Sequence, residues 1–253
     1  FFALRQSCDT SSLMFQLPKI IGHRGAAGYA PENTLAGIAT ASDMGITWVE
    51  FDVKLTKDSV PILMHDETLE RTTNGSGKVA EATWAEIQEL EAGSHFSEGF
   101  ATEAVPSLEQ ALDLMIELGL GINLEFKPCP GRERETVEAT LDVLSTYWDE
   151  HDRLLLSSFQ IQCLETAMEM APEWRRGLLL GAEFAENWRD IANHLEVSTI
   201  NIDGNKVNAT QLGAFLGYGK PVLAYTVNDE VLGQQLFDAG ITSIFSDTPD
   251  IFE

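Results

Sequence analysis

Short apolar runs alternate with amphipathic segments along most of the chain, from about residue 19 onward. The runs are rich in Ile, Leu and Val and indicate buried strands, whereas the segments between them place apolar residues at helical spacing. Nine strands are predicted in this way, and we expect the one at 60–64 to fold back as the second arm of a hairpin. The eight remaining strands alternate with helices, which predicts an α/β protein with the architecture of a (β/α)8 TIM barrel.

The eight barrel strands are expected at about 19–22, 48–55, 121–127, 154–159, 177–180, 199–202, 221–226 and 243–245. Helices are expected to begin near residues 33 and 107 and to cover 132–149, 160–171, 184–195, 208–217 and 229–239. Thr34 or Asn33 is the expected N-cap of the first helix, because its side chain can accept a hydrogen bond from a free backbone N–H. An open doubly wound sheet is the alternative fold, but no GxGxxG loop follows the first strand.

Residues 66–106 interrupt this alternation. They are rich in turn-forming residues, and the spacing of Thr83 and Glu86 predicts a short helix with a capping box. We expect a small insertion after the hairpin of the second strand, either a lid or a small subdomain. Residues 1–18 are expected to be an N-terminal extension, with the barrel domain over 19–253. Met14 is a candidate natural start, in which case residues 1–13 would not be native.

The composition is that of a globular protein, with 44% apolar and 22% charged residues, but 40 acidic against 16 basic residues give a net charge of −24. This charge disfavours nucleic acid and a stable association with an anionic membrane as partners. No apolar run reaches membrane-spanning length. Cys8, Cys129 and Cys163 are odd in number and far apart, which favours a reducing compartment and hence the cytoplasm. A monomer and a homodimer both stay open.

Charged residues recur at the ends of the predicted strands, where the active site of a barrel lies. The first strand ends at His23 and Arg24. Glu50 and Asp52 are two apart on the second strand, so both point to the same side. An antiparallel return of the hairpin brings His65 back to about the level of Glu50. Two carboxylates and two imidazoles are therefore expected at one end of the barrel.

The third strand adds Glu125 and Lys127, again two apart. Three carboxylates without a nearby Cys (Glu50, Asp52 and Glu125) predict a hard oxygen site for Mg²⁺ or Ca²⁺. Arg24 and Lys127 beside such a cation would receive a phosphate. The two histidines can act as general base and general acid near neutral pH. The combination predicts hydrolysis of a phosphate diester, because one proton carrier would serve the nucleophile and the other the leaving oxygen.

Each residue also has a purely structural interpretation. Glu50 and Asp52 could lie on the solvent face of an edge strand, His23 could be a hydrogen-bonded core residue, Tyr225 could be core, and His65 with Asp66 could cap a helix. Ser157 and Ser158 resemble nucleophiles, but no GxSxG elbow surrounds them, so we interpret them as polar groups at a strand end.

A set of short motifs runs from about Lys19 to the end of the chain. They are His23-Arg24-Gly25, Pro31-Glu32-Asn33-Thr34, Glu50-x-Asp52, Thr56-Lys57-Asp58, His65-Asp66, Thr72-Thr73-Asn74-Gly75-x-Gly77, Pro106-Ser107-Leu108-Glu109, Glu125-x-Lys127, Ser157-Ser158-Phe159, Tyr225-Thr226-Val227-Asn228 and Asp247-x-Pro249. In this combination the chain resembles the glycerophosphodiester phosphodiesterase family, in its bacterial cytoplasmic type.

The resemblance implies a TIM barrel that hydrolyses glycerophosphodiesters, such as glycerophosphocholine and glycerophosphoethanolamine, to sn-glycerol 3-phosphate and an alcohol. It implies one divalent cation, Mg²⁺ before Ca²⁺, and a nucleophilic glycerol hydroxyl that forms a cyclic phosphate which water then opens. The implied roles are metal binding for Glu50, Asp52 and Glu125, base for His23, acid for His65, and substrate binding for Arg24, Lys127, Glu32, Phe159 and Tyr225.

The sequence departs from the family pattern at a few positions. Tyr225 stands where Trp is common, which leaves the preferred headgroup open. A phospholipase-type phosphodiesterase acting on a lipid or lysolipid headgroup is the alternative function, although the 66–106 segment is mostly polar and such enzymes need apolar loops. A silent barrel that binds a phosphorylated ligand is a third hypothesis, which nothing in the sequence supports.

Overall fold

The computed structural model describes residue 15 and residues 17–252, so the expectation for residues 1–13 and Met14 concerns a part of the chain outside the described residues. Eight parallel strands form a closed barrel in the order β1-β9-β8-β7-β6-β5-β4-β2, and pairing of β1 with β2 completes the ring. The strands are β1 (Ile20–Gly22), β2 (Trp48–Leu55), β4 (Gly121–Phe126), β5 (Leu154–Ser158), β6 (Arg175–Leu180), β7 (Thr199–Asp203), β8 (Val222–Tyr225) and β9 (Ser243–Ser246). The predicted TIM barrel is confirmed.

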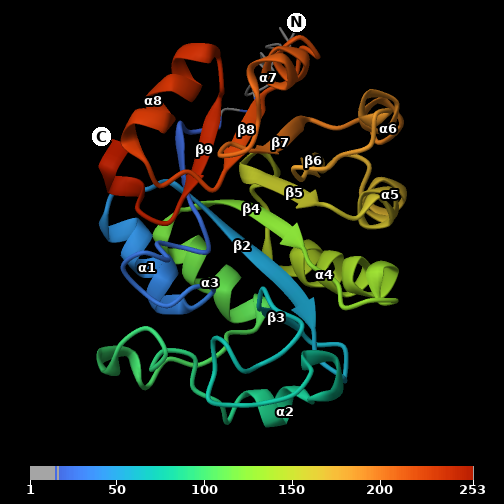
Figure 1. Cartoon of the computed structure of the whole chain (residues 1–253). Coiled ribbons are helices and arrows are strands. Elements are labelled where there is room, and N and C mark those ends of the chain that lie inside the picture. The colour runs from blue at the N-terminus through green and yellow to red at the C-terminus, as the bar shows by residue number, and fades with distance from the viewer. Residues whose placement is uncertain (1–14, 16, 253) are drawn as a thin grey trace, which may run out of the picture.

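Helices surround the strands on the outside of the barrel (Figure 1). They are α1 (Leu35–Asp43), α3 (Leu108–Leu118), α4 (Glu133–Tyr147), α5 (Ile161–Met170), α6 (Trp188–His194), α7 (Ala209–Leu216) and α8 (Glu230–Ala239), with a short 3-10 helix at Pro249–Phe252. Thr34 is the N-cap of α1 and accepts a hydrogen bond from the Gly37 N–H. Helix α3 begins with a capping box between Ser107 and Gln110, which satisfies two backbone donors at its start.

Alternation along the strands separates the apolar core from the barrel interior. On β2, Val49, Phe51 and Val53 belong to a hydrophobic cluster shared with α1, α3 and α4, so Glu50 and Asp52 between them point inward. A second cluster joins strands β6–β9 to helices α6–α8. On β2 the outward residues therefore hold the helices, and Glu50 and Asp52 are left on the inward side. The inward side is not polar throughout, because Ile21, Leu155, Leu223 and Phe245 form an apolar cluster of their own.

The predicted hairpin forms as expected. β3 (Pro61–Leu63) pairs antiparallel with β2, with Val53 opposite Leu63. The segment after β3 holds the 3-10 helices Val79–Glu81 and Glu98–Phe100 and the four-residue α2 (Trp84–Ile87), which begins with the predicted capping box of Thr83 and Glu86. Its own small apolar cluster packs against β3 and includes Ile62, which keeps the segment on the barrel (Figure 1).

Two predicted boundaries are wrong. β6 begins at Arg175, two residues before the predicted start, because Arg176 lies in the strand with its guanidinium donating to the carbonyls of Pro172, Trp174 and Leu195. Helix α6 begins at Trp188 and not at 184, and Phe184 before it packs against Phe215 with ring centroids 5.2 Å apart. Among the described helices, none combines the length and the apolar character needed to cross a membrane.

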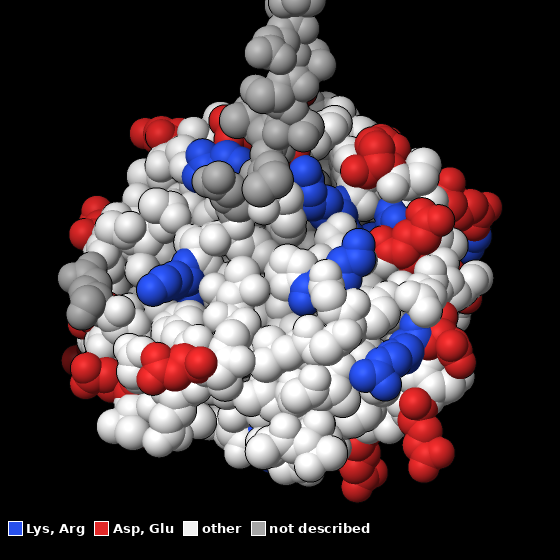
Figure 2. Space-filling model, turned by 90° about the horizontal axis from the view of Figure 1, so that it is seen from above, with Lys and Arg blue, Asp and Glu red and all other residues white. Residues whose placement is uncertain are grey.

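Surface charge on the face shown in Figure 2 is unevenly spread. Acidic side chains lie mainly around the edge of this face, and basic side chains lie in small separate groups nearer its middle. The described part of this face therefore has no continuous basic area of the kind that binds nucleic acid.

Candidate active site

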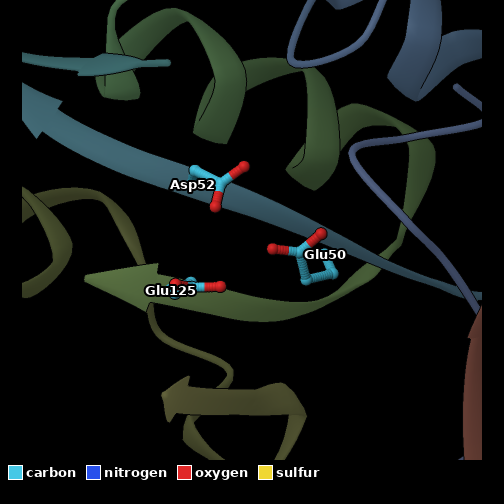
Figure 3. A group of neighbouring side chains, drawn as sticks. All are labelled: Glu50, Asp52 and Glu125. Atoms are coloured by element: carbon cyan, nitrogen blue, oxygen red, sulfur yellow. The ribbon is translucent and has the colours of Figure 1, made fainter. Parts of the chain in front are cut away.

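Three buried carboxylates meet at the carboxyl ends of two neighbouring strands. β2 and β4 pair in parallel with Asp52 opposite Glu125, and Glu50 lies one inward position earlier on β2. Figure 3 shows the three side chains converging from these two strands. One oxygen of each lies within 4.8 Å of the others. Among the described residues, Glu50, Asp52 and Glu125 form the one group of three or more side chains close enough together to bind a metal ion.

Burial makes it costly to keep all three carboxylates charged. Burial and the neighbouring carboxylates raise the pKa of Glu50, and burial and Asp52 raise the pKa of Glu125 to about 7. Burial also acts on Asp52, but Arg24 and Lys127 outweigh it and lower its pKa to about 2. Such a cluster of oxygen ligands suits a divalent cation, because the cation would relieve the repulsion among them.

Arg24 and Lys127 both contact the carboxylates. Arg24 Nε is 3.3 Å from Asp52 Oδ2, and Arg24 Nη1 donates to Glu32 Oε1 at 2.8 Å. Lys127 Nζ is 3.0 Å from Glu125 Oε1 and 3.8 Å from Asp52 Oδ1. Two fixed cations next to the carboxylates can neutralise a bound phosphate.

His23 is held by a carboxylate that directly follows the last strand. Its Nδ1 is 2.7 Å from Asp247 Oδ1, and Asn228 donates to the other oxygen of Asp247. Its Nε2 lies 3.9 Å from Glu50 Oε2 and 3.5 Å from Thr226 Oγ1. Because Nδ1 is engaged, Nε2 is the nitrogen left to exchange a proton with a ligand.

His65 is held in the same way by its neighbour, with Nδ1 2.7 Å from Asp66 Oδ1. Burial lowers the pKa of His65. Arg71, from the segment after β3, donates two hydrogen bonds to Asp66 and two to Glu32, at 2.7–2.8 Å. Since Glu32 also binds Arg24, a continuous chain of charged contacts joins the two sides of the site.

These side chains surround one cavity of about 260 Å³, which we call the reaction cavity. Eight residues predicted for the site line it: His23, Arg24, Glu50, His65, Glu125, Lys127, Phe159 and Tyr225. Asp52 and Glu32 lie outside this lining and contact Arg24. The Phe159 and Tyr225 rings meet edge to face, with centroids 5.7 Å apart, and form an aromatic wall.

The model of the glycerophosphoryl diester phosphodiesterase family matches residues 23–251. The chain belongs to this family. A glycerophosphodiester phosphodiesterase of Bacillus subtilis is 33% identical over 92% of this chain and 84% of its own length, and one of Caldanaerobacter subterraneus is 31% identical over 91% and 94%.

A solved structure from Oleispira antarctica, a phosphodiesterase in complex with the product sn-glycerol-3-phosphate, superposes with a TM-score of 0.90. It is 38% identical and covers 93% of this chain and 95% of its own. The protein is therefore an enzyme, a glycerophosphodiester phosphodiesterase with a barrel fold.

Several structural interpretations of the phosphodiesterase residues do not fit the structure. Glu50 and Asp52 are buried at the barrel mouth, not on a solvent face. No described helix begins at Asp66. The structural interpretation of the two serines, in contrast, agrees with the structure: Ser157 accepts a hydrogen bond from Asn123, and Ser158 donates to the Phe126 carbonyl at the strand end.

Sequence reasoning missed the groups that orient the phosphodiesterase site. Asp247 and Asp66 were named only as parts of motifs, and Asp66 also as a possible helix cap, without a role for either beside a histidine. Arg71 gave no signal, because it lies in a turn-rich segment whose path the pattern does not determine. Asn33 both donates to the Asp52 carboxylate and accepts from the Asp52 N–H, whereas the sequence indicated only a helix cap and a motif position for it.

Proposed function

We propose that this phosphodiesterase hydrolyses water-soluble glycerophosphodiesters, such as glycerophosphocholine and glycerophosphoethanolamine, in a reaction that depends on one divalent cation. The products would be sn-glycerol 3-phosphate and an alcohol. The observation that carries the proposal is one cavity lined by two histidines, two cations and the buried carboxylates of Glu50 and Glu125, with the third carboxylate, Asp52, in contact with both cations. The similar Oleispira antarctica structure holds sn-glycerol 3-phosphate, which is the product this reaction would give.

Glu50, Asp52 and Glu125 would hold the cation. An all-oxygen ligand set favours Mg²⁺, with Ca²⁺ as the second choice. When bound, the cation would supply Lewis-acid polarisation and neutralise charge on the phosphate. Arg24 and Lys127 would bind the phosphate oxygens, and Glu32 would keep Arg24 in place through their 2.8 Å contact.

The two histidines would move the protons. His23 Nε2 would accept the proton of the substrate's own glycerol hydroxyl as that oxygen attacks phosphorus. The bond from phosphorus to the leaving alcohol would break, and His65 would give that oxygen a proton. Water would then open the resulting cyclic phosphate with the two histidines in exchanged roles. The carboxylates of Asp247 and Asp66 would hold each imidazole with Nε2 toward the substrate.

Phe159 and Tyr225 would form a wall of the substrate site. We propose a soluble small molecule as substrate and the cytoplasm as location, where the buried free thiols of Cys129 and Cys163 would stay reduced.

The deciding experiment is release of sn-glycerol 3-phosphate from glycerophosphocholine, with EDTA and then with Mg²⁺ or Ca²⁺ added back. We expect turnover to stop in EDTA and to return with one ion. Turnover that is indifferent to EDTA would refute the metal dependence. Activity on phospholipid liposomes without activity on soluble diesters would refute the substrate class and favour the phospholipase alternative.

A further inference from the structure

A second cavity of about 470 Å³ adjoins the reaction cavity, and we call it the outer cavity. Four side chains line both cavities: His65, Glu125, Lys127 and Phe159. The rest of the outer wall includes Glu67 and Thr68 after β3, Pro128 after β4 and Gln160 after β5. Its volume falls in the range of about 300–1,000 Å³ that is typical of small-molecule sites. The outer cavity is therefore large enough for one end of a substrate.

We propose that the outer cavity binds the leaving alcohol and selects a cationic one, of the choline or ethanolamine type. This inference rests on the proposed function, because it divides the substrate between the two cavities. The glycerol phosphate would occupy the reaction cavity, and the alcohol would extend past Lys127.

The distribution of the catalytic groups supports this division. His23, Arg24 and Glu50 line only the reaction cavity, whereas His65 lines both. The nucleophile and the leaving group of an in-line displacement lie on opposite sides of phosphorus. With the base in the reaction cavity and the acid at the junction, the bond to the leaving oxygen would point toward the outer cavity.

The charges of the outer cavity favour a cation. Most of its ionic groups have partners within the protein: Glu125 contacts Lys127, and Asp66 contacts His65 and Arg71. Glu67, in contrast, is exposed and forms no ion pair with the described residues. The Glu67 carboxylate can therefore form an ion pair with a cationic ligand.

Two lysines of this wall, Lys54 and Lys127, act in the opposite direction, but Lys127 is paired with Glu125 and Asp52, which leaves Lys54. Its side chain is 1% exposed, and its Nζ donates to the Lys127 carbonyl, so its ammonium group is turned into the protein. Both residues line the cavity, but Lys54 is buried and Glu67 is exposed. The overall charge of −24 further favours the approach of cationic over anionic alcohols.

Phe159 supplies a second attraction for a cation. The ring already lies under a cation, with Lys127 Nζ 5.5 Å from its centroid, and 40% of the residue is exposed. The Tyr225 ring packs edge to face against the Phe159 ring. An exposed aromatic ring and a carboxylate without an ion pair among the described residues, lining the same cavity, favour a quaternary or primary ammonium group.

The test compares kcat/KM for glycerophosphocholine with kcat/KM for glycerophosphoglycerol, whose alcohol is neutral, in the full-length protein. We expect Glu67→Lys and Phe159→Leu each to lower the choline-to-glycerol ratio by about 5- to 10-fold. Glu89→Lys is the matched control, because Glu89 is exposed in the same segment and outside both cavities, and it changes the net charge equally. The choline-to-glycerol ratio of the Glu89→Lys variant should equal that of the wild type.

The outcomes separate the two proposals. A choline-to-glycerol ratio that Glu67→Lys leaves unchanged, or that Glu89→Lys lowers equally, would overturn the outer cavity as a cationic alcohol site. A wild-type enzyme that hydrolyses glycerophosphoglycerol but not glycerophosphocholine would also overturn it and leave the proposed function standing. Failure of the wild type on every glycerophosphodiester would overturn the proposed function itself, and the outer-cavity assignment with it.

Discussion

Replacing Glu125 with Gln would test whether the three carboxylates repel one another in the absence of a cation and so destabilise the folded protein. Glu125 is buried beside Asp52, and its pKa is raised to about 7 even with Lys127 in contact. Gln has nearly the same shape and carries no charge. At pH 8 in EDTA the wild-type protein must keep this side chain ionised, so we expect Glu125→Gln to raise the free energy of unfolding.

The size of the effect follows from the pKa values. The change from 4.5 to about 7, at about 1.4 kcal/mol per pKa unit, corresponds to about 3 kcal/mol. The folded state holds the proton more tightly than the unfolded state. The stability due to the protonated acid is therefore complete below pH 4.5 and is lost as the pH rises through about 7. The advantage of Gln should be about 3 kcal/mol at pH 8 and small near pH 5.

Urea denaturation in EDTA at the two pH values would measure this difference. Glu117→Gln, on the exposed side of α3, is the control and should change the free energy of unfolding by less than about 0.5 kcal/mol. Added Mg²⁺ should stabilise the wild type and not Glu125→Gln, because only the wild type keeps the three carboxylates. A variant that is destabilised at pH 8, or stabilised equally at both pH values, would refute the reasoning.

Three further predictions concern single residues. His23→Ala and His65→Ala should each reduce release of sn-glycerol 3-phosphate to background while the circular dichroism spectrum stays that of the wild type; near-native turnover in either would remove that histidine from the mechanism. Arg71→Lys should lower kcat about 10-fold, because Lys cannot bridge Glu32 and Asp66 with paired hydrogen bonds, whereas Arg134→Lys at an exposed ion pair should leave kcat unchanged. Gly25→Ala should cost about 3 kcal/mol or more in thermal or urea unfolding, since φ is +90° and a Cβ would meet the Gly37 carbonyl carbon at 2.4 Å. Gly45→Ala, with φ +80° and open space, should cost about 1 kcal/mol, and equal costs would contradict the crowding argument.

The sequence predicted those features that depend on local pattern. Alternation along β2 predicted that Glu50 and Asp52 share a side, and the hairpin spacing predicted where His65 returns. The barrel followed from the count of strands, since eight parallel strands of this length have few other arrangements. These inferences need only the period of a strand and the common direction of the barrel strands.

Features that depend on distant contacts were missed. The predicted barrel requires β9 to pair with β1, but the pattern does not indicate that the carboxylate of Asp247 just after β9 will reach His23 just after β1. Arg71 reaches Glu32 through the fold of an irregular segment without periodicity. The start of β6 was misplaced because hydrophobic patterns exclude arginines, although Arg176 is buried by donating to three carbonyls. In each case a polar side chain is satisfied by a partner that only the tertiary structure provides.

The contact between His23 and Asp247 joins residues 224 positions apart. During ribosomal synthesis the strands emerge in order, so β2 and β4 can bring the three carboxylates together while the second half of the chain is still unmade. Only when β9 emerges and pairs with β1 does His23 gain the carboxylate that orients it. A nascent chain could therefore capture a cation well before it could turn over substrate. The onset of activity would report barrel closure, whereas the onset of cation binding would report only the folding of the first half.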